Sequence, residues 1–157
     1  GILSTHLHSE GEHAEELVLV APGMGKRWVN DILADNDPED ESYFPYMNGQ
    51  FVFKNAVVRF SEVIMEGLQE NGLEVSDIDM LIPHQANLRI SQFIQQKFKL
   101  NDDQVFNNIQ KYGNTTAASI PIALTEAWEQ GKIKEGDHVV LAAFGSGFTW
   151  ASAVIEW

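Results

Sequence analysis

The sequence predicts an α/β domain with a buried, mostly parallel sheet. Short apolar runs alternate with segments whose apolar residues recur at helical spacing, so strands and helices follow one another along the chain. The run from Val139 to Phe144 is apolar at every position, as in strands that are buried on both faces. The length of 157 residues suits one compact domain, residues 1–157, and no internal repeat is present.

The first part of the chain contains two predicted strands followed by a loop. Residues 2–8 alternate apolar and polar side chains, as a half-buried strand does. Residues 17–21 form a second apolar run that stops at Pro22. From 24 to 47 the pattern is irregular and acidic, so we expect mostly loop there, with a short helix at 26–34.

Two helices and a strand are predicted in the middle of the chain. From Gly49 to Asn71 apolar residues recur at steps of three and four, which indicates a long helix, and Gly72 suits its C-terminal end. Residues 79–82 form a short buried strand that stops at a proline. A second helix follows, with Asn87 as its N-cap, and its predicted inner face carries Ile90, Phe93, Ile94 and Phe98.

The last part predicts a weaker strand at 105–109, a third helix and a hairpin. The third helix ends at Gly131, and its apolar face carries Ile120, Ala123, Leu124, Ala127 and Trp128. Two apolar strands, 139–144 and 148–155, flank the segment Gly145-Ser146-Gly147, which is typical of a hairpin.

Composition and charge exclude several functional classes. Ten basic residues against 23 acidic ones give a net charge of −13, which disfavours binding to nucleic acid phosphates. No apolar run approaches the roughly 20 residues that span a bilayer, and the first twenty residues carry too many charges for a secretory signal. We therefore expect a cytoplasmic protein that binds neither nucleic acid nor membrane. The absence of cysteine excludes disulfides, thiolate metal sites and a cysteine nucleophile within this chain.

Polar or flexible residues follow the predicted strands in three loops, residues 83–87, 112–116 and 144–148. Because sites in open α/β sheets form where strands end, we expect the three loops to open at one edge of the sheet. His84 and Asn114 could there donate hydrogen bonds to one oxygen and stabilise negative charge that develops on it.

Each loop also has a simpler interpretation. A single loop histidine such as His84 is more often a hydrogen-bonded core residue, and Asn114 suits a tight turn or helix cap. The glycines at 145–147 suit a hairpin turn. His6 and His8 share one strand face and could bind a metal, but no carboxylate lies at ligand spacing on that strand, so we expect solvent exposure.

Other catalytic motifs do not fit the sequence. Ser146 is not the nucleophile of a G-x-S-x-G turn, because Phe144 stands where the first glycine is needed. Residues 23–25 (GMG) lack the third glycine of a dinucleotide-binding loop. The following Lys26 lacks the upstream glycine of a phosphate-binding loop.

Five segments resemble the type III β-ketoacyl-acyl carrier protein synthases, a family within the thiolase superfamily. They are GILSTHLHSEG (1–11), MNGQFVFKNAV (47–57), IPHQANLRI (82–90), YGNTTAASIPIAL (112–124) and AFGSGFTWASAVIEW (143–157). The combination of PHQAN and YGNT is specific, since related elongating synthases carry a second histidine where Asn114 stands. The resemblance covers nearly the whole chain, except about 22–46.

The resemblance implies a thiolase-like half-domain, with a mixed, mostly parallel five-stranded sheet and helices on both faces. Members of the family consist of two similar halves and form homodimers, and this chain resembles the second, C-terminal half. Their nucleophilic cysteine lies in the first half, which is consistent with its absence here. The chain by itself is therefore expected to be inactive in condensation.

The resemblance also implies the roles of several residues in starting fatty-acid synthesis. In the family, the cysteine takes an acyl group from acyl-CoA, and malonyl-acyl carrier protein then loses CO₂ and attacks it. His84 and Asn114 match the catalytic pair that hydrogen-bonds the malonyl thioester oxygen as it becomes an enolate. The backbone N–H of Ser146 matches a second oxyanion donor, and Phe144 would exclude water from the departing carboxylate. No metal and no cofactor beyond these thioester substrates is implied.

Further positions match the path of the substrate. Ala86 and Asn87 match residues lining the tunnel for the pantetheine arm, and Phe53 matches its mouth. The basic patch that receives the acidic carrier protein is matched by Lys54, Arg89 and, more weakly, Lys97. For these three cations the alternative is an ordinary solvated helix face.

Two alternatives to a fatty-acid enzyme stay open at this point. One is a related synthase with the same histidine and asparagine that serves a polyketide or signalling pathway. The other is a non-catalytic half-domain that contributes only to folding or dimerisation. The coding sequence upstream of Gly1 would distinguish them, since an enzyme needs a preceding half of similar length with one cysteine.

Overall fold

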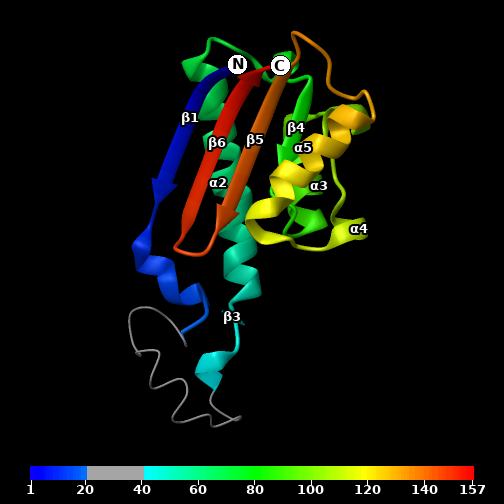
Figure 1. Ribbon diagram of the computed structural model, residues 1–157. Helices are drawn as coiled ribbons and strands as arrows, with labels where there is room; N and C mark the ends of the chain where they lie inside the picture. Colours follow the sequence, from blue (N-terminus) through cyan, green and yellow to red (C-terminus); the bar gives the residue numbers. More distant parts are fainter. Residues whose placement is uncertain (21–40) are drawn as a thin grey trace.

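A four-stranded mixed sheet forms the centre of the domain, with the strand order β1-β6-β5-β4 (Figure 1). The computed structural model describes residues 1–20 and 41–157. Strand β6 runs antiparallel to both β1 and β5, whereas β5 and β4 are parallel. The four strands are β1 (Ile2–Ser9), β4 (Met80–Pro83), β5 (His138–Gly145) and β6 (Thr149–Glu156).

Helices cover both faces of this sheet, as expected. Helices α2 (Gly49–Glu70) and α3 (Leu88–Phe98) lie behind it in Figure 1, and α5 (Ser119–Glu129) lies in front of β4. The long helix α2 contacts β1, β5 and β6, and α3 packs beside it. The fold therefore has two separate apolar layers, one on each side of the sheet.

Strand β4 contributes side chains to both layers because successive residues of a strand point to opposite faces. Leu81 is fully buried in the layer beneath α2. Met80 and Ile82 pack in the other layer, against Ala123 and Ala127 of α5. Burying each large apolar side chain of this kind contributes about 1.5–3 kcal/mol. The strand that carries the His84 loop is thus held from both sides.

Helix α2 follows the predicted pattern closely. Buried residues recur along it at steps of three and four, including Ala56, Phe60, Ile64 and Leu68. The side chain of Asn48 accepts the backbone N–H of Phe51 at 3.3 Å and caps the N-terminus. The chain leaves the helix through Gly72, whose φ of 66° is easily adopted by glycine.

One glycine of α2 allows the helix to lie close against β6. A Cβ atom added to Gly67 would stand 2.9 Å from Cγ2 of Val154 and 3.3 Å from Oγ of Ser152. The Ser152 hydroxyl also donates to the carbonyl of Val63 at 2.8 Å. Side chains at these β6 positions therefore fill the space that a larger residue at 67 would need.

Several short elements connect the main ones. Strands β2 (Leu17–Val18) and β3 (Tyr46–Met47) pair in a separate two-stranded sheet. Of the predicted strand 17–21, only residues 17 and 18 form a strand within the described residues. The predicted helix 26–34 lies outside the described residues. The remaining short elements are η1 (Gly11–Glu16), η2 (Glu41–Tyr43), η3 (Val75–Asp77), η4 (Asp102–Gln104), α4 (Ile109–Tyr112) and η5 (Thr116–Ala118).

The α/β class and the mixed sheet are confirmed, but three details of the sheet differ from the prediction. The described residues form four strands of this sheet in place of the expected five. Only one of its three strand pairs is parallel, so the sheet is not mostly parallel. The expected strand at 105–109 is reduced to one parallel bridge between Val105 and Leu81. Pairing stops there because the side chain of Gln85 takes the N–H groups of Asn108 and Ile109, where α4 begins.

Two aromatic residues that were predicted to face the core are exposed. Phe93 of α3 is 42% exposed and meets the ring of Phe53 edge-on at 6.4 Å. Trp128 of α5 is 56% exposed and lies near the ring of Trp157, also at 6.4 Å. In both helices the innermost positions are taken by other members of the pattern, such as Ile94. Among the described helices, none combines the length and apolarity that crossing a membrane requires.

Candidate active site

The three loops singled out in the sequence meet at one pocket of about 1630 Å³. His84 follows β4, Asn114 lies between α4 and η5, and residues 144–146 end β5 and begin the hairpin turn. The three loops therefore come together as expected. Only two of them follow a strand, however, because the Asn114 loop follows helix α4. The pocket also includes Phe53, Lys54, Ala86, Asn87 and Arg89.

His84 is held by contacts on its backbone and on one ring nitrogen. Its backbone N–H donates to the carbonyl of Ala142 at 2.8 Å, which continues the β4–β5 pairing. Its Nδ1 lies 2.6 Å from Oγ of Ser119, the first residue of α5. Burial lowers the pKa of His84 below the ordinary 6.5, so the ring is neutral at neutral pH. In the described part of the chain Nε2 has no hydrogen-bond partner.

Asn114 combines a turn with a free donor group. Its side-chain oxygen accepts the backbone N–H of Thr116 at 2.8 Å, so the turn interpretation is correct as far as it goes. The amide nitrogen has no hydrogen-bond partner among residues 1–20 and 41–157, and Asn114 lines the pocket. Thr116 has φ 51°, an unfavourable conformation for a β-branched residue, which marks a constrained backbone beside Asn114.

Gln85, which no sequence motif distinguishes, connects the histidine loop to the segment that carries Asn114. The side chain is 3% exposed, and its oxygen accepts the backbone N–H groups of Asn108 at 3.0 Å and Ile109 at 3.2 Å. Its Nε2 donates to the carbonyls of Pro83 at 2.6 Å and Phe106 at 3.4 Å. The only sequence signal was its place directly after the histidine.

Glu126 of α5 also holds the segment that leads to Asn114. Its carboxylate accepts hydrogen bonds from Lys111 and the Tyr112 hydroxyl, both at 2.5 Å, and from Asn108 at 2.8 Å. The hydrogen bond from Lys111 is the main reason that the pKa of Glu126 falls to about 2. The same contact raises the pKa of Lys111. No sequence pattern pointed to Glu126, because its partners are 14 to 18 residues away.

The glycine turn contributes to the pocket lining, and two aromatic side chains pack together next to it. Phe144 is buried and its ring lies 4.9 Å from that of the fully buried Phe148. Ser146 is exposed at the pocket and its hydroxyl donates to the carbonyl of Leu17 at 2.6 Å. Gly147 has φ 137°, and a Cβ there would lie 2.8 Å from Thr149, so glycine is required at this point of the turn.

Basic side chains lie at the pocket rim. Lys54 stands in the second turn of α2 and Arg89 in the first turn of α3, and both are exposed. No carboxylate pairs with either of them in the described residues. Lys97 is exposed near the end of α3 and does not line the pocket, which separates it from the other two predicted cations.

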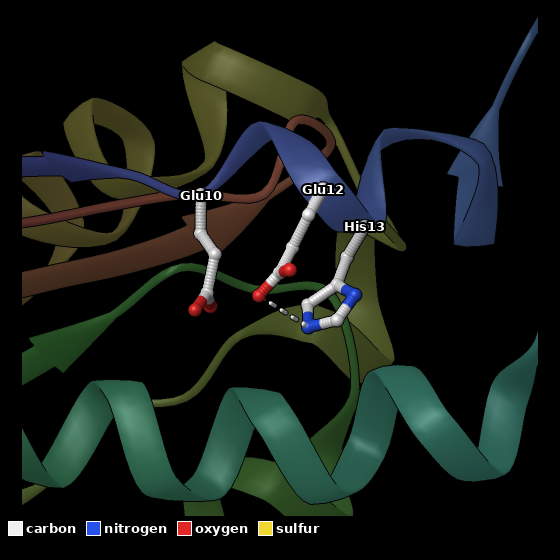
Figure 2. Close-up of side chains that lie close together, drawn as sticks. All are labelled: Glu10, Glu12 and His13. Carbon is white, nitrogen blue, oxygen red and sulfur yellow. Dashed lines mark ion pairs between the residues drawn. The ribbon is translucent and has the colours of Figure 1, made fainter.

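A second group of polar residues, outside the predicted site, lies on η1 and the residue before it. Glu10, Glu12 and His13 place one ligand atom each within 4.8 Å of one another, and Figure 2 shows them side by side above α2. The Glu10 carboxylate is already paired with Arg59 at 2.8 Å, and the His13 ring packs edge-on against Phe51. The cation that Glu10 binds is thus the guanidinium of this chain.

The expectation of solvent exposure holds for His8 and not for His6. A carboxylate does stand beside them, but it comes from helix α2 and not from their own strand. The Nε2 of His8 lies 2.6 Å from Glu66, and the Nδ1 of His6 lies 3.4 Å from the same side chain. Both histidines contact α2, yet His8 is exposed as expected, whereas the side chain of His6 is mostly covered.

Comparisons with known proteins point to one family. The family described as 3-Oxoacyl-[acyl-carrier-protein (ACP)] synthase III C terminal matches residues 68–157, more than half of the chain. The whole chain is 43% identical to a β-ketoacyl-[acyl-carrier-protein] synthase III of Clostridioides difficile and 46% identical to that of Alkalilimnicola ehrlichii. In both comparisons the chain spans 46% of the relative, or about half its length.

Solved structures of the family have the same fold. The synthase III of Thermus thermophilus superposes with a TM-score of 0.84 at 40% identity, covering 100% of this chain and 46% of that one. The enzyme of Aquifex aeolicus gives 0.83 at 37% identity, covering 99% and 44%. The thiolase-like half-domain expected from the sequence is thereby confirmed. The chain belongs to the β-ketoacyl-acyl carrier protein synthase III family and corresponds to the C-terminal half of its members.

Proposed function

We propose that this chain supplies the decarboxylating half of the active site in a 3-oxoacyl-acyl carrier protein synthase III that starts fatty-acid synthesis. The observation that carries the proposal is the pairing of two neutral donors in one pocket. His84 is kept neutral by burial, and Asn114 has its amide oxygen occupied, so each offers N–H to the same space. Neither group brings a negative charge to the site.

In the proposed reaction these donors act on the malonyl thioester. The bond to its carboxylate breaks, CO₂ leaves, and the electron pair moves into an enolate whose oxygen His84 and Asn114 hydrogen-bond. The enolate carbon then forms a bond to the acyl carbon held on the cysteine of the other half, and the thiolate departs. Removing one donor of this kind typically costs about 3–4 kcal/mol of transition-state stabilisation. The pair of donors makes a metal or other cofactor unnecessary for the decarboxylation.

The apolar ring of Phe144 supports the loss of carboxylate. Phe144 packs on Phe148, lines the same pocket as the two donors and presents no polar side-chain atom, so a carboxylate placed beside it is poorly hydrated. The proposed role of Ser146 is a backbone N–H to the second oxyanion, formed on the acyl thioester. Its side chain is occupied by the Leu17 carbonyl, which leaves the backbone for this purpose.

The substrate arm would enter between helices α2 and α3. Phe53, Ala86 and Asn87 line the pocket on that side, so we assign them to the pantetheine. Lys54 and Arg89 at the rim carry charge opposite to that of an acidic carrier protein, whereas Lys97 lies farther along α3. We infer that the complete enzyme consists of two halves and forms a homodimer in the cytoplasm. Its substrates would be acyl-CoA and malonyl-acyl carrier protein.

The experiment separates the two half-reactions in the complete enzyme that contains this chain. His84→Ala and Asn114→Ala should each suppress CO₂ release from malonyl-carrier protein and leave transfer of a radiolabelled acyl group to the cysteine largely intact. Mutants that lose acylation and keep decarboxylation would refute the assignment. The chain without its cysteine-bearing half should form no acetoacetyl-carrier protein, because it offers no thiol to hold the acyl group.

A further inference from the structure

We propose that Ser119 is a positioning residue that holds His84 in the tautomer with hydrogen on Nε2. Ser119 is the first residue of α5 and is 2% exposed, and its hydroxyl lies 2.6 Å from Nδ1 of His84. Only the effect of this tautomer on catalysis rests on the function proposed above. The tautomer itself follows from which hydrogen bonds the buried hydroxyl can make.

A buried hydroxyl needs an acceptor for its hydrogen. The backbone N–H of Gln85 donates to Oγ of Ser119 at 3.3 Å, so this contact uses a lone pair and leaves the hydroxyl hydrogen free. Within the described residues, Nδ1 of His84 is the one acceptor in hydrogen-bond contact with that hydroxyl. If Nδ1 carried hydrogen, the hydroxyl would be a buried donor without a partner, which is unfavourable.

The neutral imidazole carries one hydrogen, so an acceptor at Nδ1 means a donor at Nε2. Burial favours the neutral ring, as the lowered pKa of His84 indicates. The Nε2–H has no partner in residues 1–20 and 41–157 and His84 lines the pocket. The chain of bonds therefore runs from the Gln85 backbone through Ser119 to His84 and presents one donor to a substrate oxygen.

The position of Ser119 links the two donors of the site. It stands five residues after Asn114, on the same constrained segment that includes Thr116 with its φ of 51°. Helix α5 holds this segment against β4 through the apolar layer of Ala123 and Ala127. One segment thus supplies the second donor itself and the group that orients the first.

A ¹⁵N-histidine spectrum of the complete protein tests the inference directly. Long-range proton–nitrogen correlations distinguish a protonated from an unprotonated ring nitrogen, and the His84 signals are identified by their loss in His84→Gln. At neutral pH we expect Nδ1 of His84 to be unprotonated and Nε2 to carry hydrogen. A wild-type spectrum with hydrogen on Nδ1 overturns the inference without any Ser119 variant.

Substitution of the serine gives a second, independent measurement. Ser119→Ala should allow both tautomers and slow decarboxylation about 3- to 10-fold, the loss expected for one hydrogen bond, with acyl transfer unchanged. Ser119→Thr, which keeps the hydroxyl, should restore the Nε2–H tautomer. Ser91→Ala is the matched control, because Ser91 is also buried but its hydroxyl makes no hydrogen bond to a described residue.

The two readouts separate this inference from the proposed function. An unchanged tautomer in Ser119→Ala overturns the positioning role, whatever the rates. A tautomer that shifts in Ser119→Ala and returns in Ser119→Thr supports it even if decarboxylation does not change, and in that case the function proposed for His84 fails.

Discussion

The side-chain oxygen of Gln85 accepts the backbone N–H of Asn108 at 3.0 Å, and this bond joins the strand end that carries His84 to the segment that carries Asn114. The same oxygen accepts the N–H of Ile109, the first residue of α4. The Gln85 side chain thus accepts backbone N–H groups that would otherwise pair in a fifth β-strand. The donor pair of the pocket depends on this buried amide for its relative placement.

We expect Gln85→Met to destabilise the protein by about 1–3 kcal/mol, because the two N–H groups would lose their buried acceptor. The damage should fall on decarboxylation more than on acyl transfer, since the Asn114 segment is displaced from His84. Urea unfolding followed by circular dichroism measures the first effect, and separate half-reaction assays measure the second. Gln96→Met, an exposed substitution on α3, is the control and should change stability by no more than about 0.5 kcal/mol.

A second prediction concerns the contact between α2 and β6. Gly67→Ala should destabilise by about 1–3 kcal/mol, because the new methyl group would stand 2.9 Å from Val154 in a packed layer. This outcome opposes helix propensity, which favours alanine over glycine inside a helix. Gly49→Ala is the comparison, since the nearest atom to its added Cβ is Met47 Cε at 3.9 Å. Thermal unfolding of both variants decides the point, and equal midpoints would contradict the close packing.

The parts of the fold that depend on periodicity could be predicted from the sequence. Helix α2 and the β5–β6 hairpin repeat their patterns over many residues, so single exceptions do not obscure them. The segment 105–109 was mistaken for a strand because Val105 and Phe106 favour strands, although the backbone beyond them pairs with a side chain. Propensity describes neighbours along the chain and cannot anticipate a competing side chain from another loop.

The candidate site, like the fold, could be predicted only in part from the sequence. His84 and Asn114 stand in short, distinctive segments, and the pocket brings them together as expected. Ser119 and Glu126 could not be found in this way, because their importance comes from partners 14 to 35 residues distant. Nothing in the composition of α5 distinguishes them from other polar residues on a helix.

The hydrogen bonds of Glu126 should make the free energy of unfolding depend on pH in the acid range. The pKa of this carboxyl is about 2 in the folded protein against an ordinary value of 4.5, with the Lys111 hydrogen bond as the main cause. As pH falls, the unfolded chain therefore binds the proton first, which favours unfolding. The contribution of Glu126 is complete above pH 4.5 and disappears as pH falls through about 2.

The measurement compares urea unfolding of wild type and Glu126→Gln from pH 7 to pH 2. The difference in unfolding free energy should stay constant down to about pH 4.5 and then shrink toward pH 2. Glu129→Gln, at an exposed position on the same helix without a side-chain partner among described residues, should show no such trend. A difference that does not vary with pH would mean that the carboxylate charge is unimportant for holding Lys111 and Tyr112.

The last prediction concerns the carrier protein, because a chain of net charge −13 should repel an acidic partner at long range. Screening limits exposed charges to a reach of about 8 Å at physiological salt, so a local basic patch can still guide docking. Lys54 and Arg89 flank the pocket that holds His84 and have no carboxylate partner in the described residues. Such charges mainly set the rate and orientation of encounter.

We therefore expect Lys54→Glu combined with Arg89→Glu to raise KM for malonyl-carrier protein by at least about tenfold in the complete enzyme, which corresponds to about 1.4 kcal/mol. Decarboxylation of malonyl-CoA, which has no protein partner, should change much less, and added salt should narrow the difference between the two substrates. Lys97→Glu is the matched control, because Lys97 carries the same charge on α3 but lies outside the pocket. Equal losses with both substrates would instead assign Lys54 and Arg89 to the pocket or the fold.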